Sequence, residues 1–303
     1  MPAASTTIGA LYALAAAMCF AAWNVFLQRA LQRGSGDGTR LSLFTLSAGL
    51  VGVYVPITLG LYGLGRLPLL HPAGGIWFLV AGLLTGGAGP YLATQATWRI
   101  GAARSVVIRL LDPLFAFVIA FLFLGERVGS QPLIGVALIV LALGLLQKER
   151  TDQAQAGMKS GRGAGFAAAV AASLCFTLGS VARKSGLLLL PSVIVSSAGE
   201  GLGGLLIVLP VVLRGGRGLL RDALKRENRD YWLASLGNIG GVFCLNSALQ
   251  RVPVPVAVAV RNTSPWFALL FVPLVLGMHQ RPGRWTWLST ALLTGGMLLI
   301  VLR

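Results

Sequence analysis

The stretch Arg109-Leu-Leu-Asp-Pro-Leu-Phe115 has a counterpart 152 residues later, Arg261-Asn-Thr-Ser-Pro-Trp-Phe267, in which the arginine, the proline and the final phenylalanine keep their places. A shift of 156 places Ala16-Ala-Met-Cys-Phe20 on Ala172-Ser-Leu-Cys-Phe176. The two shifts are nearly equal and each is about half the chain. The sequence therefore predicts an internal repeat of two copies.

The composition is that of a membrane protein. The 303 residues are 55% hydrophobic and only 11% charged, with a mean hydropathy of +0.78, whereas soluble domains are about one quarter charged. A bilayer-spanning helix needs about 20 apolar residues. The net charge of +16 comes mostly from basic residues between apolar stretches, which favours contact with membrane lipids and a role in topology over nucleic-acid binding.

Apolar stretches bounded by charge, glycine or proline predict ten membrane spans. The spans are Ile8–Gln28, Leu41–Leu64, Gly75–Thr97, Ala102–Leu124, Gln131–Leu146, Gly163–Ala182, Leu187–Leu213, Tyr231–Leu249, Val254–Leu276 and Trp285–Leu302. With two copies, each has five spans. Because five is odd, the second copy enters the membrane the opposite way up, as in many secondary transporters. The predicted fold is all-α and polytopic, with a first repeat at residues 1–150, a charged connecting loop at 151–162 and a second repeat at 163–303.

Three stretches of the first copy resemble the EamA-type permeases of the drug/metabolite transporter superfamily. They are Leu111–Phe117, Phe123–Arg127 with its Gly-Glu pair, and Gly135–Val140; Trp23 beside Asn24 in the first span is also similar. The resemblance covers almost the whole chain and implies a ten-helix carrier of small metabolites without a bound cofactor. The second copy has Gly277-Met278 where the family repeats Gly-Glu, so a role that needs two equivalent carboxylates is not predicted.

The charge pattern and the resemblance imply opposite orientations. Most of the 25 Lys and Arg residues lie in connections after odd-numbered spans, while Arg183 and Lys184 count among the few on the other side. The positive-inside rule then places both termini outside the cell. The resemblance implies that both termini are inside, so the orientation stays open.

Arg109 and Arg261 are the first candidates for substrate binding, because charges inside a membrane are costly and by default functional or paired. They hold matching positions in spans four and nine and could face one central cavity. A guanidinium binds a carboxylate or phosphate with two parallel hydrogen bonds. The alternative is a local pair of Arg109 with Asp112, three residues further on.

Each of these spans is interrupted by a proline, Pro113 after Asp112 and Pro265 after Ser264. A proline inside a helix frees a carbonyl group and kinks the helix, which predicts either a gating hinge or a purely structural bend. Glu126, at the end of span four, is either a capping residue of the following turn or a gating or proton-coupling carboxylate.

Glu200 is the one acidic residue deep in span seven. It is a candidate for proton coupling, or it forms an ion pair across the bundle with Arg109 or Arg261. Five further residues are candidates for lining the substrate path, since polar helix faces in lipid turn inward to a cavity or to a neighbouring helix. They are Trp23, Asn24, Tyr91, Gln95 and Asn246.

Together these features predict a transporter of the cytoplasmic (inner) membrane that moves a small polar molecule with a carboxylate or phosphate by alternating access. We expect no metal, no cofactor and no catalytic residue, because the chain has two histidines and no phosphate-binding loop. The alternatives are a lipid-carrier flippase of the same fold and, from another class, a membrane-embedded enzyme.

Overall fold

The computed structural model describes residues 3–33, 38–67, 71–100, 108, 111–126, 129–153, 162–276 and 284–301, and its regular elements there are all helices. The first half contains α1 (Ala3–Arg33), α2 (Gly38–Gly63), α3 (Pro72–Gly82), the π-helix η1 (Leu83–Ala88), α4 (Gly89–Ile100), α6 (Asp112–Leu124) and α7 (Ser130–Gln153). The second half contains α8 (Arg162–Leu189), α9 (Val193–Ala223), the 3₁₀-helix η2 (Arg226–Asn228), α10 (Arg229–Leu249), α11 (Val254–Arg261), α12 (Ser264–Leu276) and α13 (Arg284–Val301).

Helices dominate because the sequence is apolar enough to cross lipid, where every backbone polar group must find its partner inside the chain. Within the described ranges, six helices are long and apolar enough to cross a membrane: Ser5–Arg33, Gly38–Gly63, Pro72–Ala96, Gly163–Leu189, Val193–Pro210 and Arg226–Leu249. Two shorter apolar helices, Asp112–Leu124 and Leu133–Ala142, accompany them. The predicted all-α polytopic membrane fold is confirmed.

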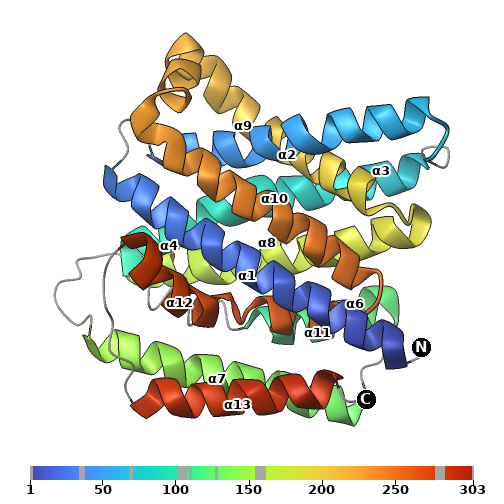
Figure 1. Cartoon of the computed structure of the whole chain (residues 1–303), viewed down its shortest axis with the longest axis vertical. Helices are drawn as coiled ribbons and strands as arrows, with labels where there is room; N and C mark the ends of the chain where they lie inside the picture. Colours follow the sequence, from blue (N-terminus) through green and yellow to red (C-terminus); the bar gives the residue numbers. More distant parts are fainter. Residues whose placement is uncertain are drawn as a thin grey trace.

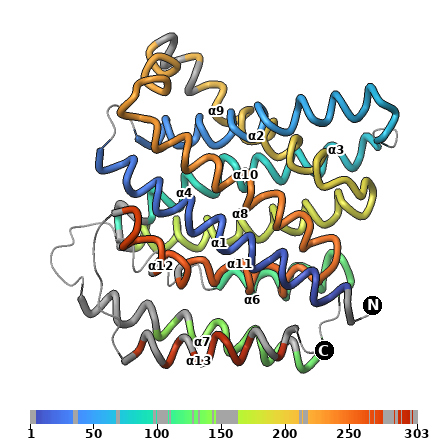
Figure 2. The backbone as a smooth tube through the Cα atoms, viewed as in Figure 1, coloured from blue at the N-terminus to red at the C-terminus, as the bar shows by residue number. Residues whose placement is uncertain are grey.

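Corresponding helices of the two halves run in opposite directions. In Figure 1, α1 and α8 cross the bundle in opposite senses, as do α2 and α9, and α7 and α13. The packing follows the same relationship: α1 contacts α10 and α12 of the second half, and its counterpart α8 contacts α3, α4 and α6 of the first half. The halves are therefore interleaved in space, and in Figure 2 α10 of the second half lies beside α1 and α2 of the first.

Several predicted boundaries need correction. The basic stretch at 214–230 is not a loop throughout, because α9 continues to Ala223 and η2 follows. Span six does not end at Ala182, because α8 continues to Leu189. The predicted connection between the repeats at 151–162 lies mostly outside the described residues, so that division stays a prediction.

The helices approach one another closely because small residues lie between them. The buried positions of α1 are mainly alanine, and a Cβ atom on Gly82 of α3 would lie 2.2 Å from the carbonyl oxygen of Glu200 in α9. A Cβ atom on Gly203 of α9 would lie 2.2 Å from the carbonyl oxygen of Leu79 in α3. Gly203 also belongs to the spacing Gly199-xxx-Gly203, which is typical of helices in close contact. Large apolar side chains such as Leu274 and Phe123 point outward, as in a protein surrounded by lipid.

Candidate functional site

Two basic side chains lie buried in α8, where the sequence predicted a connection between spans. Arg183 is 3% exposed and Lys184 is 7% exposed. Both lie in the last third of the helix, which continues through the apolar stretch Leu187–Leu189. The prediction that they are connection charges is therefore wrong. Buried charges require partners, and those partners define the polar interior of the bundle.

Arg183 forms an ion pair with Glu200 of α9, Nη2 of the arginine contacting Oε1 of the carboxylate. Thr85 of η1 joins the pair: its hydroxyl donates to Glu200 Oε1 over 2.7 Å and accepts from Arg183 Nη2 over 2.7 Å. Glu200 thus does pair with an arginine of another helix, but that arginine is Arg183 and not the predicted Arg261, and the other predicted partner, Arg109, lies outside the described residues. We call Arg183, Glu200 and Thr85 the central cluster.

The local backbone explains how Thr85 reaches the pair. η1 replaces one turn of regular helix in the middle of span three, and such π-helical turns occur often at functional sites. Its glycines Gly86 and Gly87 allow α9 to come close; a Cβ atom at Gly86 would lie 3.0 Å from the Cα atom of Gly204. The carbonyl oxygen of Ala81 lies 2.8 Å from the same hydroxyl and is the alternative acceptor for its single proton.

Lys184 lies one residue further along α8 and faces a different set of groups. Its Nζ donates to the carbonyl oxygens of Leu249 and Val252, the latter over 3.2 Å, and lies 3.7 Å from Oε1 of Glu126. The other carboxylate oxygen, Oε2, accepts from the backbone N–H of Val254, the first residue of α11, over 2.8 Å. Glu126 therefore caps a helix of the opposite half.

The turn that presents Glu126 depends on Gly125, which ends α6 with a φ of +63°, a conformation that favours glycine. Burial raises the pKa of Glu126 above its ordinary value of 4.5, and the Val254 N–H and Lys184 partly offset this effect. The sequence motif Gly-Glu thus has a structural meaning here: glycine reverses the chain and the carboxylate reaches across to the second half.

Asp112 and Arg261 form a third buried pair, with Arg261 Nη2 3.0 Å from Asp112 Oδ2. The hydroxyl of Ser173, from α8, donates to the other carboxylate oxygen, and that of Thr177 donates to the Asp112 carbonyl over 3.3 Å. Asp112 is completely buried. Arg261 also donates to its neighbour Asn262. Its guanidinium is thus held by an acid of the opposite half.

The predicted interruptions of spans four and nine coincide with helix starts. α6 begins at Asp112 and continues through Pro113, and α12 begins at Ser264 and continues through Pro265 after a turn at 262–263. Arg109 lies outside the described residues, so its predicted place opposite Arg261 stays a prediction.

The other candidates are dispersed. Asn246 is buried in α10 and donates to the Ser197 hydroxyl over 3.1 Å. Trp23 packs edge-on against Phe20. The remaining three candidates, Asn24, Tyr91 and Gln95, make no described contact with the central cluster. Asn24 and Tyr91 are exposed and Gln95 is half-buried. Asn24 donates to the Phe20 carbonyl of its own helix.

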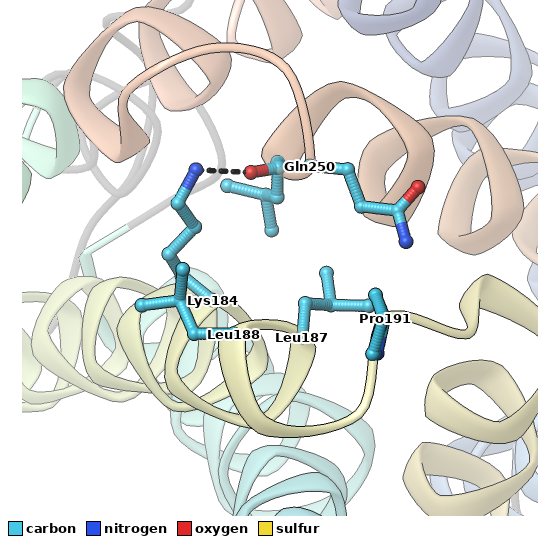
Figure 3. A pocket seen from close by; sticks show the side chains of 6 residues that line it. Lys184, Leu187, Leu188, Pro191 and Gln250 are labelled. Carbon is cyan, nitrogen blue, oxygen red and sulfur yellow. Dashed lines mark hydrogen bonds between the residues drawn. The ribbon is translucent and has the colours of Figure 1, made fainter. Parts of the chain in front are cut away.

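A pocket of about 230 Å³ lies where α8 and α10 end (Figure 3). Lys184, Leu187, Leu188, Pro191, Leu249 and Gln250 line it. The dashed bond in Figure 3 joins Lys184 to the Leu249 carbonyl. The Lys184 ammonium group is engaged by two carbonyls and lies near Glu126, and Gln250 is the other polar side chain that lines the pocket.

The three buried polar groupings share one property: each joins the two halves of the chain. Thr85, Asp112 and Glu126 come from the first half, and their partners Arg183, Arg261 and Lys184 come from the second. Sequence reasoning missed Arg183 and Lys184. The repeat carried a signal for them, since the shift of 156 aligns Lys184 with Gln28, the last residue of the first predicted span, whereas span six was ended at Ala182.

Comparisons with known proteins agree with this architecture. The profile of the EamA-like transporter family matches residues 7–147 and again residues 163–302. A solved crystal structure resembles the chain with a TM-score of 0.72 over 97% of this chain and 96% of its own, at 18% sequence identity, which shows a shared fold. No curated protein matches the chain significantly. With family matches over nearly its full length, the chain belongs to the EamA-like transporter family and is a multi-pass membrane protein of the transporter type.

Proposed function

We propose that the protein is a secondary carrier that moves a small polar metabolite across the cytoplasmic membrane by alternating access. The cargo bears a carboxylate or phosphate, an amino acid being one example. One observation carries this proposal: buried charged side chains are concentrated where the two halves of the chain contact each other. We call this contact region the seam. Asp112–Arg261, Glu126–Lys184 and Thr85–Arg183 all cross it.

Buried ion pairs are costly in apolar surroundings and contribute little net stability compared with apolar packing. Pairs at a seam can instead separate and form again as the seam opens to either side. Two interrupted spans contribute to the same seam, since α6 begins at Asp112 and α11 ends at Arg261. Such breaks provide polar backbone and hinges at the midplane sites of secondary transporters.

The surrounding lipid is the second partner in this proposal. Exposed apolar side chains cover the outer helices, and α7 and α13 pack on one another at one edge of the bundle (Figure 1). Glu200 is engaged by Arg183 and Thr85, and the simplest mechanism that we propose is exchange or facilitated diffusion.

The test is a counterflow assay. The purified protein is reconstituted into liposomes preloaded with one unlabelled amino acid, organic acid or sugar phosphate, and entry of the same labelled compound is followed without ATP. The expected result is transient, saturable accumulation of at least one compound. Protein-dependent scrambling of labelled lipid without counterflow of any soluble compound would contradict the proposal and favour a flippase.

The pH dependence provides a separate measurement. If exchange is uncoupled from protons, an imposed pH gradient leaves the steady-state accumulation unchanged, and Glu200→Gln does not alter that independence. Accumulation driven by the gradient, and lost in Glu200→Gln, would instead assign proton coupling to this carboxylate.

A further inference from the structure

The last part of α9 continues beyond the length that a membrane crossing requires. The 31 residues of this helix extend over about 46 Å at 1.5 Å per residue, whereas the hydrocarbon core of a bilayer is about 30 Å thick. The part that is apolar enough to cross a membrane is Val193–Pro210. Pro210 lies inside the helix, where a proline removes a backbone hydrogen bond and bends the axis. Residues 211–223 therefore continue as helix beyond the membrane-spanning part.

Packing holds this end of α9 against the bundle. Leu219 and Ala223 are buried in a small apolar cluster that includes residues of α1, α2 and α10. The indole N–H of Trp232 donates to the Ala223 carbonyl over 2.8 Å. In Figure 1 this end of α9 lies at the edge of the bundle, near the end of α1 and the starts of α2 and α10. The rotation of the segment about its own axis is thereby defined.

A second face of the same segment is apolar and exposed. The side chains of Leu213, Leu220 and Leu224 are each more than half exposed. At about 100° per residue they lie within about 40° of one another around the helix, and about 100° from the buried face. Gly218, on the remaining side, is exposed, and a Cβ atom there would meet nothing within 4 Å. Such an arrangement is typical of a helix that lies in the interface between lipid and water.

Basic side chains accompany the exposed leucines. Residues 211–229 contain six basic residues and two acidic ones. Arg221, Arg226 and Arg229 are exposed and form no ion pair within the described ranges, while Lys225 pairs with an acid one turn earlier. A long arginine side chain can lie along apolar surface and extend its guanidinium toward phosphate oxygens. The charges therefore favour an anionic partner.

We propose that the surface formed by residues 211–229, which we call the basic surface, binds the anionic phospholipid headgroups of the membrane that α9 crosses. The leucines enter the outer part of the acyl-chain region, and the free arginines contact headgroup phosphates. The basic surface begins where a membrane span ends, so it lies at the level of the headgroups. A soluble acidic protein or a nucleic acid would match the charges but would leave the leucines in water. The inference goes beyond the proposed carrier function and does not depend on the cargo.

The first test measures lipid selectivity. Native mass spectrometry of the full-length protein in detergent gives the Kd of phosphatidylglycerol and of phosphatidylcholine with the same acyl chains. We expect phosphatidylglycerol to bind at least tenfold more tightly, and Arg221→Gln with Arg226→Gln to reduce this preference at least threefold. The matched control, Arg66→Gln with Arg99→Gln, removes two exposed charges elsewhere on the protein and should keep the preference. An equal reduction in both double variants would overturn the inference.

A competition experiment separates a lipid surface from a simple phosphate site. Glycerol 1-phosphate carries the anionic group of the lipid without acyl chains, so it should not displace phosphatidylglycerol at the same concentration. Displacement at equal concentration would show that the leucines contribute nothing and would contradict the proposed surface.

The second test locates the leucine face. The photoactivated amino acid p-benzoylphenylalanine takes the place of Leu220 or of Gly218 in protein reconstituted into liposomes of phosphatidylglycerol and phosphatidylcholine, and mass spectrometry detects phospholipid adducts after irradiation. Because the two positions lie about 160° apart around the helix, we expect adducts at position 220 and at most a tenth as many at position 218. No adduct at position 220 would place this face in water, open to a soluble acidic partner, and would overturn the inference. Counterflow in liposomes of the unmodified protein tests the carrier function separately, so each proposal can fail alone.

Discussion

Glu126 of the first half accepts a hydrogen bond from the backbone N–H of Val254 in the second half, 2.8 Å from Oε2 to N. The first residues of a helix have backbone N–H groups without intrahelical partners, and a carboxylate there also interacts favourably with the helix dipole. One half of the protein thus supplies the cap for a helix of the other. The start of α11 therefore depends on the position of α6.

Replacing Glu126 by alanine should destabilise the protein by about 1–2 kcal/mol, the usual cost of losing a helix cap. Glu126→Gln should retain more stability, because an amide oxygen still accepts from Val254. Chemical unfolding in detergent, followed by far-UV circular dichroism, measures both effects. Asp222→Asn is the control, since the Asp222–Lys225 pair is exposed and exposed pairs contribute about 0–1 kcal/mol. Equal losses in Glu126→Ala and Asp222→Asn would contradict the capping role.

The pH dependence of stability follows from the same carboxylate. Its pKa is raised in the folded protein, so between about pH 4.5 and the raised value the folded state binds more protons than the unfolded state. The free energy of unfolding contributed by Glu126 therefore falls as pH rises through this window. Thermal midpoints measured across it should show a decline that Glu126→Gln reduces. A variant with an unchanged pH profile would show that Glu126 does not titrate there.

Removing one charge of the Asp112–Arg261 pair should lower the free energy of unfolding more than Glu126→Ala does. Asp112 is fully buried, and removing one partner of a buried ion pair destabilises a protein by about 3–5 kcal/mol. We expect Arg261→Gln alone to lower the unfolding midpoint strongly, and Asp112→Asn with Arg261→Gln to recover much of that loss. The comparison is made by thermal unfolding in one detergent. If the double variant is no more stable than Arg261→Gln, the two charges do not depend on one another.

The glycine contact between α3 and α9 predicts a steric effect. Gly203→Ala places a Cβ atom 2.2 Å from the Leu79 carbonyl, so the helices must separate, at a cost of about 1–3 kcal/mol. Gly52→Ala is the matched control in α2, because a Cβ there meets nothing within 4 Å and alanine favours the helix by up to about 1 kcal/mol. Thermal unfolding should show opposite signs for the two variants, and a neutral Gly203→Ala would contradict the close approach.

Cys19 in α1 and Cys244 in α10 lie within hydrogen-bonding reach of one another, and both are free thiols. Oxidation by copper phenanthroline with dissolved oxygen should join them and fix α1 to α10 across the two halves. Mass spectrometry of peptides under non-reducing conditions detects the bond, and counterflow should stop until a reductant is added. Cys175, the remaining cysteine, is the internal control and should stay unlinked; linkage through it would contradict the arrangement.

The sequence predicted those features that depend on local chemistry. Apolar stretches predicted the helical membrane fold, and Pro113 and Pro265 predicted interruptions of spans four and nine, which coincide with the helix starts at Asp112 and Ser264. The spacing Gly199-xxx-Gly203 is likewise typical of helices in close contact. Each of these properties depends on residues within one or two helical turns.

The partners of the charged residues could not be predicted in the same way. Glu200 has no basic residue nearby in its own span, and its partner Arg183 follows Ala182 at what looks like the end of a span. Which arginine it meets depends on how α8 and α9 are rotated toward one another, and rotation is determined by packing among several helices. The π-helical turn that presents Thr85 depends on the same packing and has no local sequence pattern that distinguishes it from a regular turn.

Helix α8 contacts all three residues that the first half contributes to the buried polar groupings. Ser173 bonds to Asp112, Arg183 to Thr85, and Lys184 lies near Glu126. With a rise of 1.5 Å per residue, these contacts extend over about 16 Å of one rigid rod. A sliding or turning α8 would break them together instead of one after another. In the alternating-access cycle that we propose, the change between inward-facing and outward-facing forms should therefore be cooperative, with a single high barrier, so that turnover is slow and rises steeply with temperature.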